Sequence, residues 1–183
     1  MVNSDERCYW LDLNTDTQKL VKEVLLQAVK KEEIAAVRKV VCELIGELAA
    51  TMTNIKQEEG GDKCPWPYEA VNWDNLMQEV SGLLACDSLD LMICGLKIMS
   101  ILFTFCMNTY SSHKAELAPM FKSSLTHSDH KVKNAAIDTF TSYLKTASPA
   151  DCKYFSSLVP QVISNVLELI DKDEELVRFE IVE

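Results

Sequence analysis

The stretch Ala36–Met52, AVRKVVCELIGELAATM, decides the fold class. Its apolar residues recur at the spacing of one helix face, which predicts an amphipathic α-helix. The residues of this stripe are Val37, Val40, Val41, Leu44, Ile45, Leu48 and Met52. A second amphipathic helix, Thr17–Lys31, precedes it. Because two such helices cannot close a core alone, we expect further helices of the same kind to cover them.

The rest of the chain continues this pattern of apolar stripes. Further helices are predicted over residues 73–85, 89–107, 113–125, 128–147 and 149–170, with another beginning at Asp173. Ser128 or Asp129 is expected to cap the fourth of these, and Pro160 to kink the fifth. Only five glycines and five prolines occur, and few stretches alternate as strands do. The predicted fold class is therefore all-α.

The segment 89–107 is apolar on nearly every side. A membrane span needs about 20 apolar residues, whereas this run is slightly shorter and carries Lys97 near its middle. The helices on either side of it are amphipathic, as in soluble proteins. We therefore expect a central helix covered by both neighbours, with no membrane insertion.

Residues 54–72 interrupt the helical pattern. They contain Gly60–Gly61, Pro65 and Pro67, so a long loop is expected. A tolerated surface insertion and a functional loop both fit this length. Trp66 and Pro67 are expected to anchor the end of the loop against the next helix. Ahead of the first helix, residues 1–14 form a lead-in with two alternatives: Trp10 and Leu11 dock on that helix, or the chain starts with a frayed end.

The helices can be paired into a repeat. The array is expected to occupy residues 15–183, as pairs 15–53, 73–108, 111–147 and 149–183. Three of the second helices share a Val–cation step, and Met92 replaces the cation in the remaining one. Aligned positions 38, 92, 133 and 178 are separated by 54, 41 and 45 residues, and the last two spacings match HEAT and armadillo repeats. We predict a HEAT-repeat α-solenoid of about four pairs; an ordinary helical bundle is the alternative.

Charge and cysteine usage limit the class of protein. The chain carries 18 Lys and Arg against 28 Asp and Glu, a formal charge of −10. This excess of acid argues against nucleic acid as a partner. It fits basic protein partners, or simply solubility. The seven cysteines include no CxxC pair and no signal peptide leads the chain, so reduced thiols in the cytosol or nucleus are expected.

Cofactor and metal sites are not expected. Cys42, Cys94 and Cys106 fall within helical stripes and are interpreted as small packing residues. His127 and His130 form an HxxH motif, but no Cys or carboxylate cluster follows at ligand spacing. A helix-cap or surface role is therefore favoured over a metal site.

Several stretches resemble the N-terminal region of importin-beta-type karyopherins, and most closely the karyopherin beta-3 group. The stretches are Leu25–Val29 (LLQAV), Val37–Ala49 (VRKVVCELIGELA), Trp66–Pro67 and Tyr154–Pro160 (YFSSLVP). Together they are scattered over most of residues 17–170. The insertion at residues 58–64 and the loss of the cation at Met92 depart from the family pattern.

This resemblance implies a nuclear transport receptor that shuttles between cytoplasm and nucleus. Such receptors bind cargo proteins with basic localisation signals on the inner face of the superhelix and contact nucleoporins. They release the cargo in the nucleus when the GTPase Ran, in its GTP form, binds the N-terminal repeats. In that family the second helix of each pair lines the inner face. The resemblance thus makes Arg38, Lys39, Glu43 and Glu47 candidate protein-binding residues. A solvated helix face is the alternative for each of them.

The C-terminal segment is strongly acidic. Residues 168–183 hold seven carboxylates against Lys172 and Arg178, a net charge of −5. Asp173, Glu174 and Glu175 are candidates to receive a basic localisation signal, with ordinary acids at a helix start as the alternative. The chain stops in mid-repeat at Ile181–Glu183, so we expect a fragment of a longer superhelix.

Two other classes of function compete with a transport receptor. An enzyme is not expected, because the sequence has no Gly-rich phosphate loop, no HExxH motif and no recognisable Ser–His–Asp arrangement. A HEAT-repeat scaffold subunit with no transport role remains the alternative. Its binding would be indifferent to the nucleotide that Ran carries.

Overall fold

The computed structural model describes residues 9–59, 64–110 and 113–172, and this part of the chain is helical without strands. The helices are α1 (Thr15–Lys31), α2 (Ala35–Glu58), α3 (Tyr68–Val71), α4 (Leu76–Leu84), α5 (Leu89–Tyr110), α6 (Lys114–Leu125), α7 (His130–Thr146), α8 (Pro149–Tyr154) and α9 (Val159–Lys172), with a short 3₁₀ turn at Ser156–Leu158. None of these helices is long and apolar enough to cross a membrane. The all-α prediction is confirmed.

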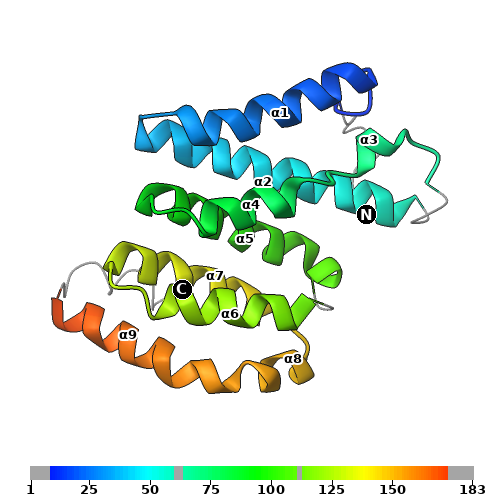
Figure 1. Ribbon diagram of the computed structural model, residues 1–183. Coiled ribbons are helices and arrows are strands. Elements are labelled where there is room, and N and C mark those ends of the chain that lie inside the picture. Colours follow the sequence, from blue (N-terminus) through cyan, green and yellow to red (C-terminus); the bar gives the residue numbers. More distant parts are fainter. Residues whose placement is uncertain (1–8, 60–63, 111–112, 173–183) are drawn as a thin grey trace.

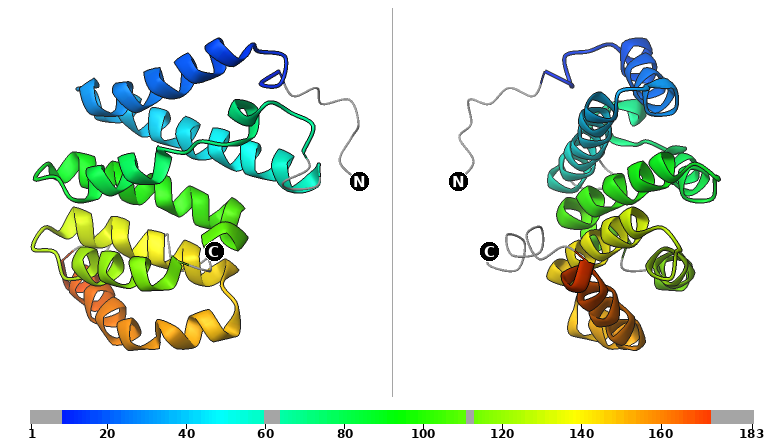
Figure 2. Two further views of the ribbon diagram at one scale, coloured as in Figure 1. Left: turned by 45° about the vertical axis from the view of Figure 1, so that its right-hand side comes forward. Right: turned by 90° about the vertical axis from the view of Figure 1, so that its left-hand side faces the viewer.

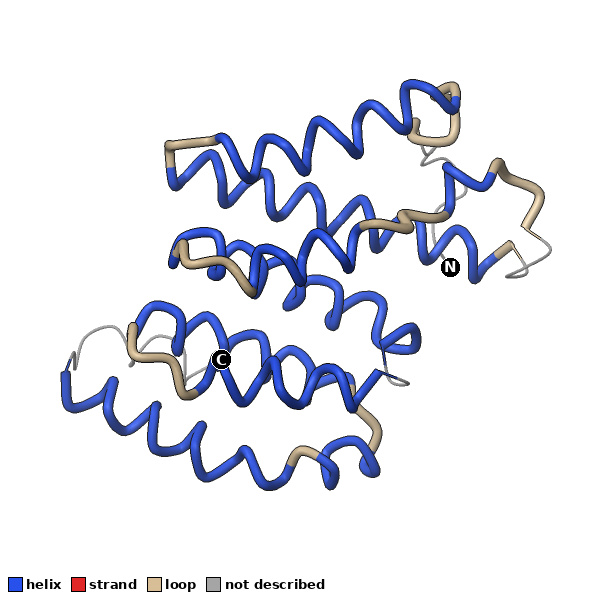
Figure 3. The backbone as a smooth tube through the Cα atoms, viewed as in Figure 1, coloured by secondary structure: helices blue, strands red, loops and turns tan. Residues whose placement is uncertain are grey.

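The helices stack in pairs that follow chain order from top to bottom in Figure 1. One layer, here called the B layer, holds α2, α5 and α7; the other, the A layer, holds α1, α4 and α6 (Figure 2, right). Each A helix packs on the B helix that follows it, and α9 packs beneath α6. Figure 3 shows the turns that join the members of each pair. This arrangement is the expected helical-repeat solenoid.

Helix α5 lies at the centre of the stack. It contacts α2 on one side, α7 on the other and α4 in the A layer. Leu96, Ile98, Met99, Leu102 and Phe103 are all essentially inaccessible to solvent. Contact on three sides explains why its sequence is apolar nearly all round, as expected for a covered central helix.

An aromatic cluster joins the third pair to α8. Phe121, Tyr143 and Phe155 are fully buried, with ring centroids 5.0–5.7 Å apart in edge-on contacts. Phe103 of α5 and Phe140 of α7 extend the cluster at centroid distances of 5.1 and 5.0 Å. Aromatic rings favour this edge-to-face geometry, so the cluster stabilises the joint by shape as well as by burial.

Helix α2 is apolar on two faces, and only one of them is buried. Ile45 and Met52 lie in the core, whereas Val37, Val40 and Leu44 remain 43%, 52% and 48% exposed. The sequence-based stripe, which put all of these residues on one face, is therefore too broad. A period of 3.6 identifies apolar positions but does not say which of them have a neighbour.

The repeat register explains the exposed face of α2. With the helices aligned at positions 38, 92 and 133, Leu44 corresponds to Ile98 of α5 and Thr139 of α7. Both of these residues are fully buried, and the Thr139 hydroxyl donates a hydrogen bond to the Leu96 carbonyl of α5 at 3.0 Å. Leu44 thus occupies the position that in later pairs faces the preceding B helix.

The loop expected over residues 54–72 is shorter in the structure. Helix α2 continues to Glu58, and Tyr68–Val71 form the one-turn helix α3. Trp66 is 38% exposed rather than packed as an anchor. Glu58 is reached because residues 53–58 contain no helix breaker before the Gly60–Gly61 step.

Trp10 and Lys22 hold the lead-in and α3 against α1. The Trp10 indole N–H donates to the Ala70 carbonyl at 2.8 Å, and the Lys22 ammonium donates to the carbonyls of Glu69 (2.5 Å) and Asn72 (2.7 Å). Lys22 is almost fully buried, and this burial lowers its pKa. Of the two alternatives for the lead-in, docking of Trp10 is therefore the one seen, and α3 is its partner as well as α1.

The helix expected over residues 149–170 is broken rather than kinked. Ser148 caps α8, its side chain accepting from the Asp151 N–H, and the chain leaves α-helical geometry after Tyr154, passing through the 3₁₀ turn before α9 begins at Val159. Pro160 falls in the first turn of α9, where the missing N–H needs no partner. Asp129, one of the two residues expected to cap α7, does so, and Asn14 caps α1.

Close packing of α2 on α5 leads to a test with a matched pair of glycines. A Cβ on Gly46 would lie 2.6 Å from Ile101 Cγ2, whereas a Cβ on Gly82 in α4 would meet no atom within 4 Å. We expect Gly46→Ala to lower the free energy of unfolding by about 1–3 kcal/mol because of overpacking. Gly82→Ala should raise it by about 0.5–1 kcal/mol through helix propensity. Urea unfolding followed by circular dichroism measures both; equal effects would contradict the packing described.

Candidate protein-binding groove

A groove runs across the B layer where α2, α5 and α7 meet. It encloses about 310 Å³ and carries charged side chains from all three helices. They are Arg38, Lys39, Asp90, Lys97 and Asp138. We call this the B-layer groove. Because the three helices belong to consecutive pairs, a ligand in it would contact three pairs at once.

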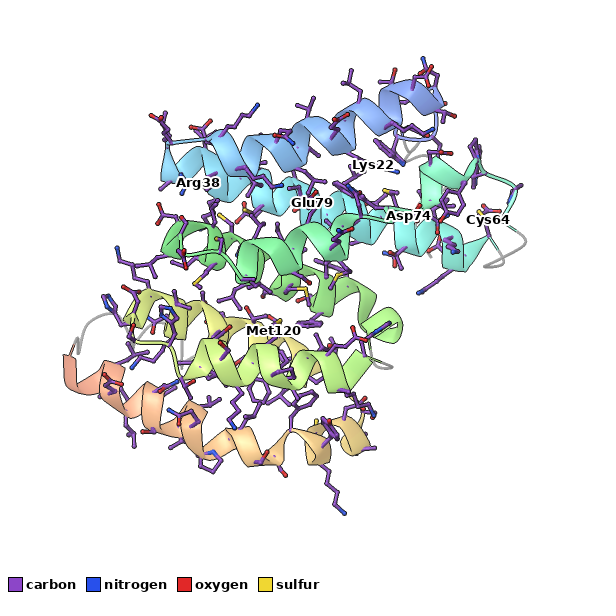
Figure 4. All side chains as sticks on the ribbon, viewed as in Figure 1. Lys22, Arg38, Cys64, Asp74, Glu79 and Met120 are labelled. Carbon is purple, nitrogen blue, oxygen red and sulfur yellow. The ribbon has the colours of Figure 1, made fainter. Side chains whose placement is uncertain are left out.

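Arg38 sits at the start of α2 beside the turn from α1 (Figure 4). Its guanidinium donates two hydrogen bonds to the Glu32 carbonyl, from Nε at 2.9 Å and from Nη2 at 2.5 Å. Its Nη1 pairs with Asp90 of α5 at 3.0 Å, and the side chain is only 13% exposed. Arg38 therefore closes the α1–α2 turn and ties the first pair to the second.

The other candidates on α2 differ in their surroundings. Glu43 lies 3.8 Å from the Lys97 ammonium of α5, both side chains being about 40% exposed, so this pair contributes little stability. Lys39 lines the groove and is exposed. Glu47 is exposed three turns along α2. The structure thus brings Arg38 and Lys39 into one groove with Glu43 at its margin through Lys97, and leaves Glu47 apart.

The acidic candidates Asp173, Glu174 and Glu175 lie outside the described residues. Their role as a receiver of basic segments stays a prediction. The side chain of Cys106 in α5 is likewise not described, so its packing role also stays a prediction.

Two thiols are among the residues that line the B-layer groove. Cys42 of α2 is 1% exposed and Cys94 of α5 is 7% exposed. The interaction between these neighbouring thiols lowers the pKa of Cys94 and raises the pKa of Cys42. The expected packing role fits their burial, but the contact between them was not expected. Sequence analysis had no signal for it because the two residues come from different pairs.

The A layer carries two further grooves that sequence reasoning missed. One encloses about 440 Å³ beside α1, α3 and α4, and includes Lys22, Asp74 and Glu79, labelled in Figure 4. The other encloses about 520 Å³ between α4 and α6 and is mainly apolar, with Met77 and Met120 in its lining. Both depend on which helices become neighbours, which the apolar period of each helix does not reveal.

The HxxH motif has a structural role. His127 accepts a hydrogen bond on Nδ1 from the Asp129 N–H at 3.0 Å, and Asp129 itself caps α7. Within the described ranges, no three His, Cys, Asp or Glu side chains converge as metal ligands do. The helix-cap interpretation of His127 is consistent with this geometry.

Comparison with known proteins identifies the family. A family model described as "IPO5-like, TPR repeats" matches residues 33–182, most of the chain. The chain belongs to the IPO5-like family. Its importin-beta-type resemblance is thereby supported at the level of the family. No curated protein and no solved structure matches the chain.

The family match places the B-layer groove of this IPO5-like chain within the family region. The match begins just before α2, so it includes the Val37–Ala49 stretch and every described helix from α2 onward. Helix α1 and its Leu25–Val29 stretch precede it. The family description names TPR repeats where HEAT repeats were expected. Both are stacked helix pairs, and the observed spacings lie nearer the HEAT length.

Two neighbouring cations of the groove offer a matched test of their roles. Arg38→Met removes the contacts to the Glu32 carbonyl and Asp90, so we expect the free energy of unfolding to fall by about 1–3 kcal/mol. Lys39→Met on the same helix should change it by no more than about 0.5 kcal/mol, because Lys39 is exposed. Chemical denaturation of the two variants checks this. If Lys39→Met lowered the free energy of unfolding and Arg38→Met left it unchanged, the assignment would be contradicted.

Proposed function

We propose that this chain is part of a nuclear transport receptor of the importin-beta type, within the karyopherin beta-3 group. In this role it binds cargo proteins and the GTP form of Ran, and shuttles between cytoplasm and nucleus. The observation that carries the proposal is the family match over residues 33–182. The open two-layer stack supports it, because such arrays present long surfaces to other proteins.

The B-layer groove is the proposed protein-binding surface. It spans three consecutive pairs and combines cations with carboxylates. This arrangement is suited to binding a protein surface of complementary charge. Lys39 is its exposed cation on α2, whereas Arg38 is engaged in the joint between pairs. We therefore assign direct partner contact to Lys39 and a positioning role to Arg38.

The A layer is proposed to serve other partners. Its mainly apolar groove between α4 and α6 lies on the opposite layer from the B-layer groove. Apolar grooves with methionine linings adapt readily to different apolar side chains. Nucleoporins are the proposed partners of this surface, so that cargo and nucleoporins would not compete for one site.

The Ran part of the proposal is tested by nucleotide preference. The immobilised chain should bind Ran loaded with a non-hydrolysable GTP analogue at least about tenfold more tightly than Ran–GDP. Lys39→Glu should weaken binding to the GTP form, because it reverses an exposed charge in the groove. Lys122→Glu, the same change on the exposed side of α6, is the matched control and should bind normally. Equal binding of both nucleotide forms would favour the scaffold function instead.

The cargo part is tested by salt dependence. The chain has a formal charge of −10, so we expect it to bind a Lys/Arg-rich peptide and to lose affinity as salt rises. The reversed triple variant Asp173→Lys, Glu174→Lys, Glu175→Lys should lose more affinity than a triple reversal of exposed acids elsewhere. Fluorescence anisotropy with a labelled peptide measures this. A salt-independent affinity, or equal losses in the two variants, would count against the acidic segment as the receiver.

A further inference from the structure

Two cysteines from consecutive pairs meet across the joint between α2 and α5. Cys42 and Cys94 are both free thiols, both are buried, and both line the B-layer groove. They lie 52 residues apart in the chain and are brought together only by the stacking of the first two pairs. Cys42 lies one turn beyond Arg38 and Cys94 one turn beyond Asp90, and the side chains of Arg38 and Asp90 are 3.0 Å apart, so the two thiols face each other across the joint.

The charges around the two thiols make them unequal. Interaction with the Cys42 thiol, with help from the Arg38 guanidinium, lowers the pKa of Cys94, although burial and Asp90 oppose this shift. The same interaction, together with burial, raises the pKa of Cys42. Cys94 is therefore the thiol that ionises first, and Cys42 is held beside it as a protonated partner. A reactive thiolate next to a resolving thiol is the arrangement that forms disulfides readily.

We propose that Cys42 and Cys94 form a reversible disulfide that links the first pair to the second. This site does not depend on the transport function proposed above. Thiols that face each other on two closely packed helices can approach the S–S bond length of about 2.05 Å through side-chain rotation and a small shift of the helices. The groove admits a small oxidant to Cys94, which is the more exposed of the two.

Hydrogen peroxide is the oxidant in this proposal, and the chemistry balances in two steps. The Cys94 thiolate attacks one peroxide oxygen; the O–O bond breaks, and hydroxide leaves to become water. The resulting sulfenic acid is then attacked by the Cys42 sulfur, which forms the S–S bond while the S–O bond breaks. The Cys42 proton leaves with that hydroxide as a second water. A small thiol reverses the reaction by exchange and is itself oxidised to a disulfide.

The other cysteines with described side chains have different surroundings. The Cys86 thiol, just beyond the C-terminal end of α4, donates to the Leu83 carbonyl of that helix at 3.1 Å. Cys64 and Cys152 are half-buried and come from the region before α3 and from α8. Cys86 is thus a suitable control thiol, because it is more accessible than Cys42 yet is engaged with backbone.

The disulfide would lock a joint that is otherwise held by side-chain contacts. The same two helices are tied by the Arg38–Asp90 ion pair and by the close approach of Gly46 to Ile101. A covalent bond in their midst would restrain any change in the angle between the first and second pairs. It would also convert two thiols that line the B-layer groove into a disulfide.

Mass spectrometry of the full chain tests the proposal. After treatment with hydrogen peroxide and alkylation of remaining thiols under denaturing conditions, the Cys42 and Cys94 peptides should be recovered as one cross-linked species. Dithiothreitol should restore both thiols, and Cys86→Ser should cross-link as the wild-type chain does. The oxidised chain should also unfold at a higher urea concentration than the reduced chain.

Two single variants separate the roles of the thiols. In Cys42→Ser, Cys94 should stop at the sulfenic acid and be trapped by dimedone; in Cys94→Ser, Cys42 should remain alkylatable. Recovery of Cys42 and Cys94 as separate alkylated peptides from the oxidised, folded wild-type chain would overturn the proposal. So would dimedone labelling of Cys42 in preference to Cys94.

Discussion

Burial of α5 between α2 and α7 is the contact on which the rest of the structure depends. Burying each large apolar side chain stabilises the fold by roughly 1.5–3 kcal/mol, and α5 contributes Leu96, Ile98, Met99, Leu102 and Phe103 to the interior. Neither the first pair nor the third could cover these residues alone. The stack is therefore held by interfaces between neighbouring pairs, and the B-layer groove exists because three such helices lie side by side.

The helices themselves were largely predictable, because their apolar residues follow a helical period and their ends carry capping residues such as Asp129 and Ser148. Which face of each helix is buried was less predictable. Val40 and Leu44 match the stripe as well as Ile45 does, yet only Ile45 is buried. Periodicity describes one helix at a time, and burial depends on what packs against it. The break before Pro160 was foreseen only as a kink for the same reason.

The candidate site shows the same limit more sharply. The charged positions of α2 were identified from the family resemblance, but the contact of Arg38 with Asp90, 52 residues away, has no signature in the sequence. That contact changes the interpretation of Arg38 from a partner-binding residue to one that positions the joint. Lys39 keeps its place as a binding candidate because it stays exposed in the groove. The IPO5-like family match supports the setting of the groove and leaves its partners to experiment.

The correspondence between Leu44, Ile98 and Thr139 has a consequence for how such proteins change over evolution. Each B helix contacts its neighbour through the same positions. A duplicated pair could therefore pack between two existing pairs without any change in their interiors. Gain or loss of a whole pair is then easier to accommodate than a change of one residue inside a joint. Selection can therefore adjust the reach of the binding surface in steps of one pair while each joint keeps its own chemistry.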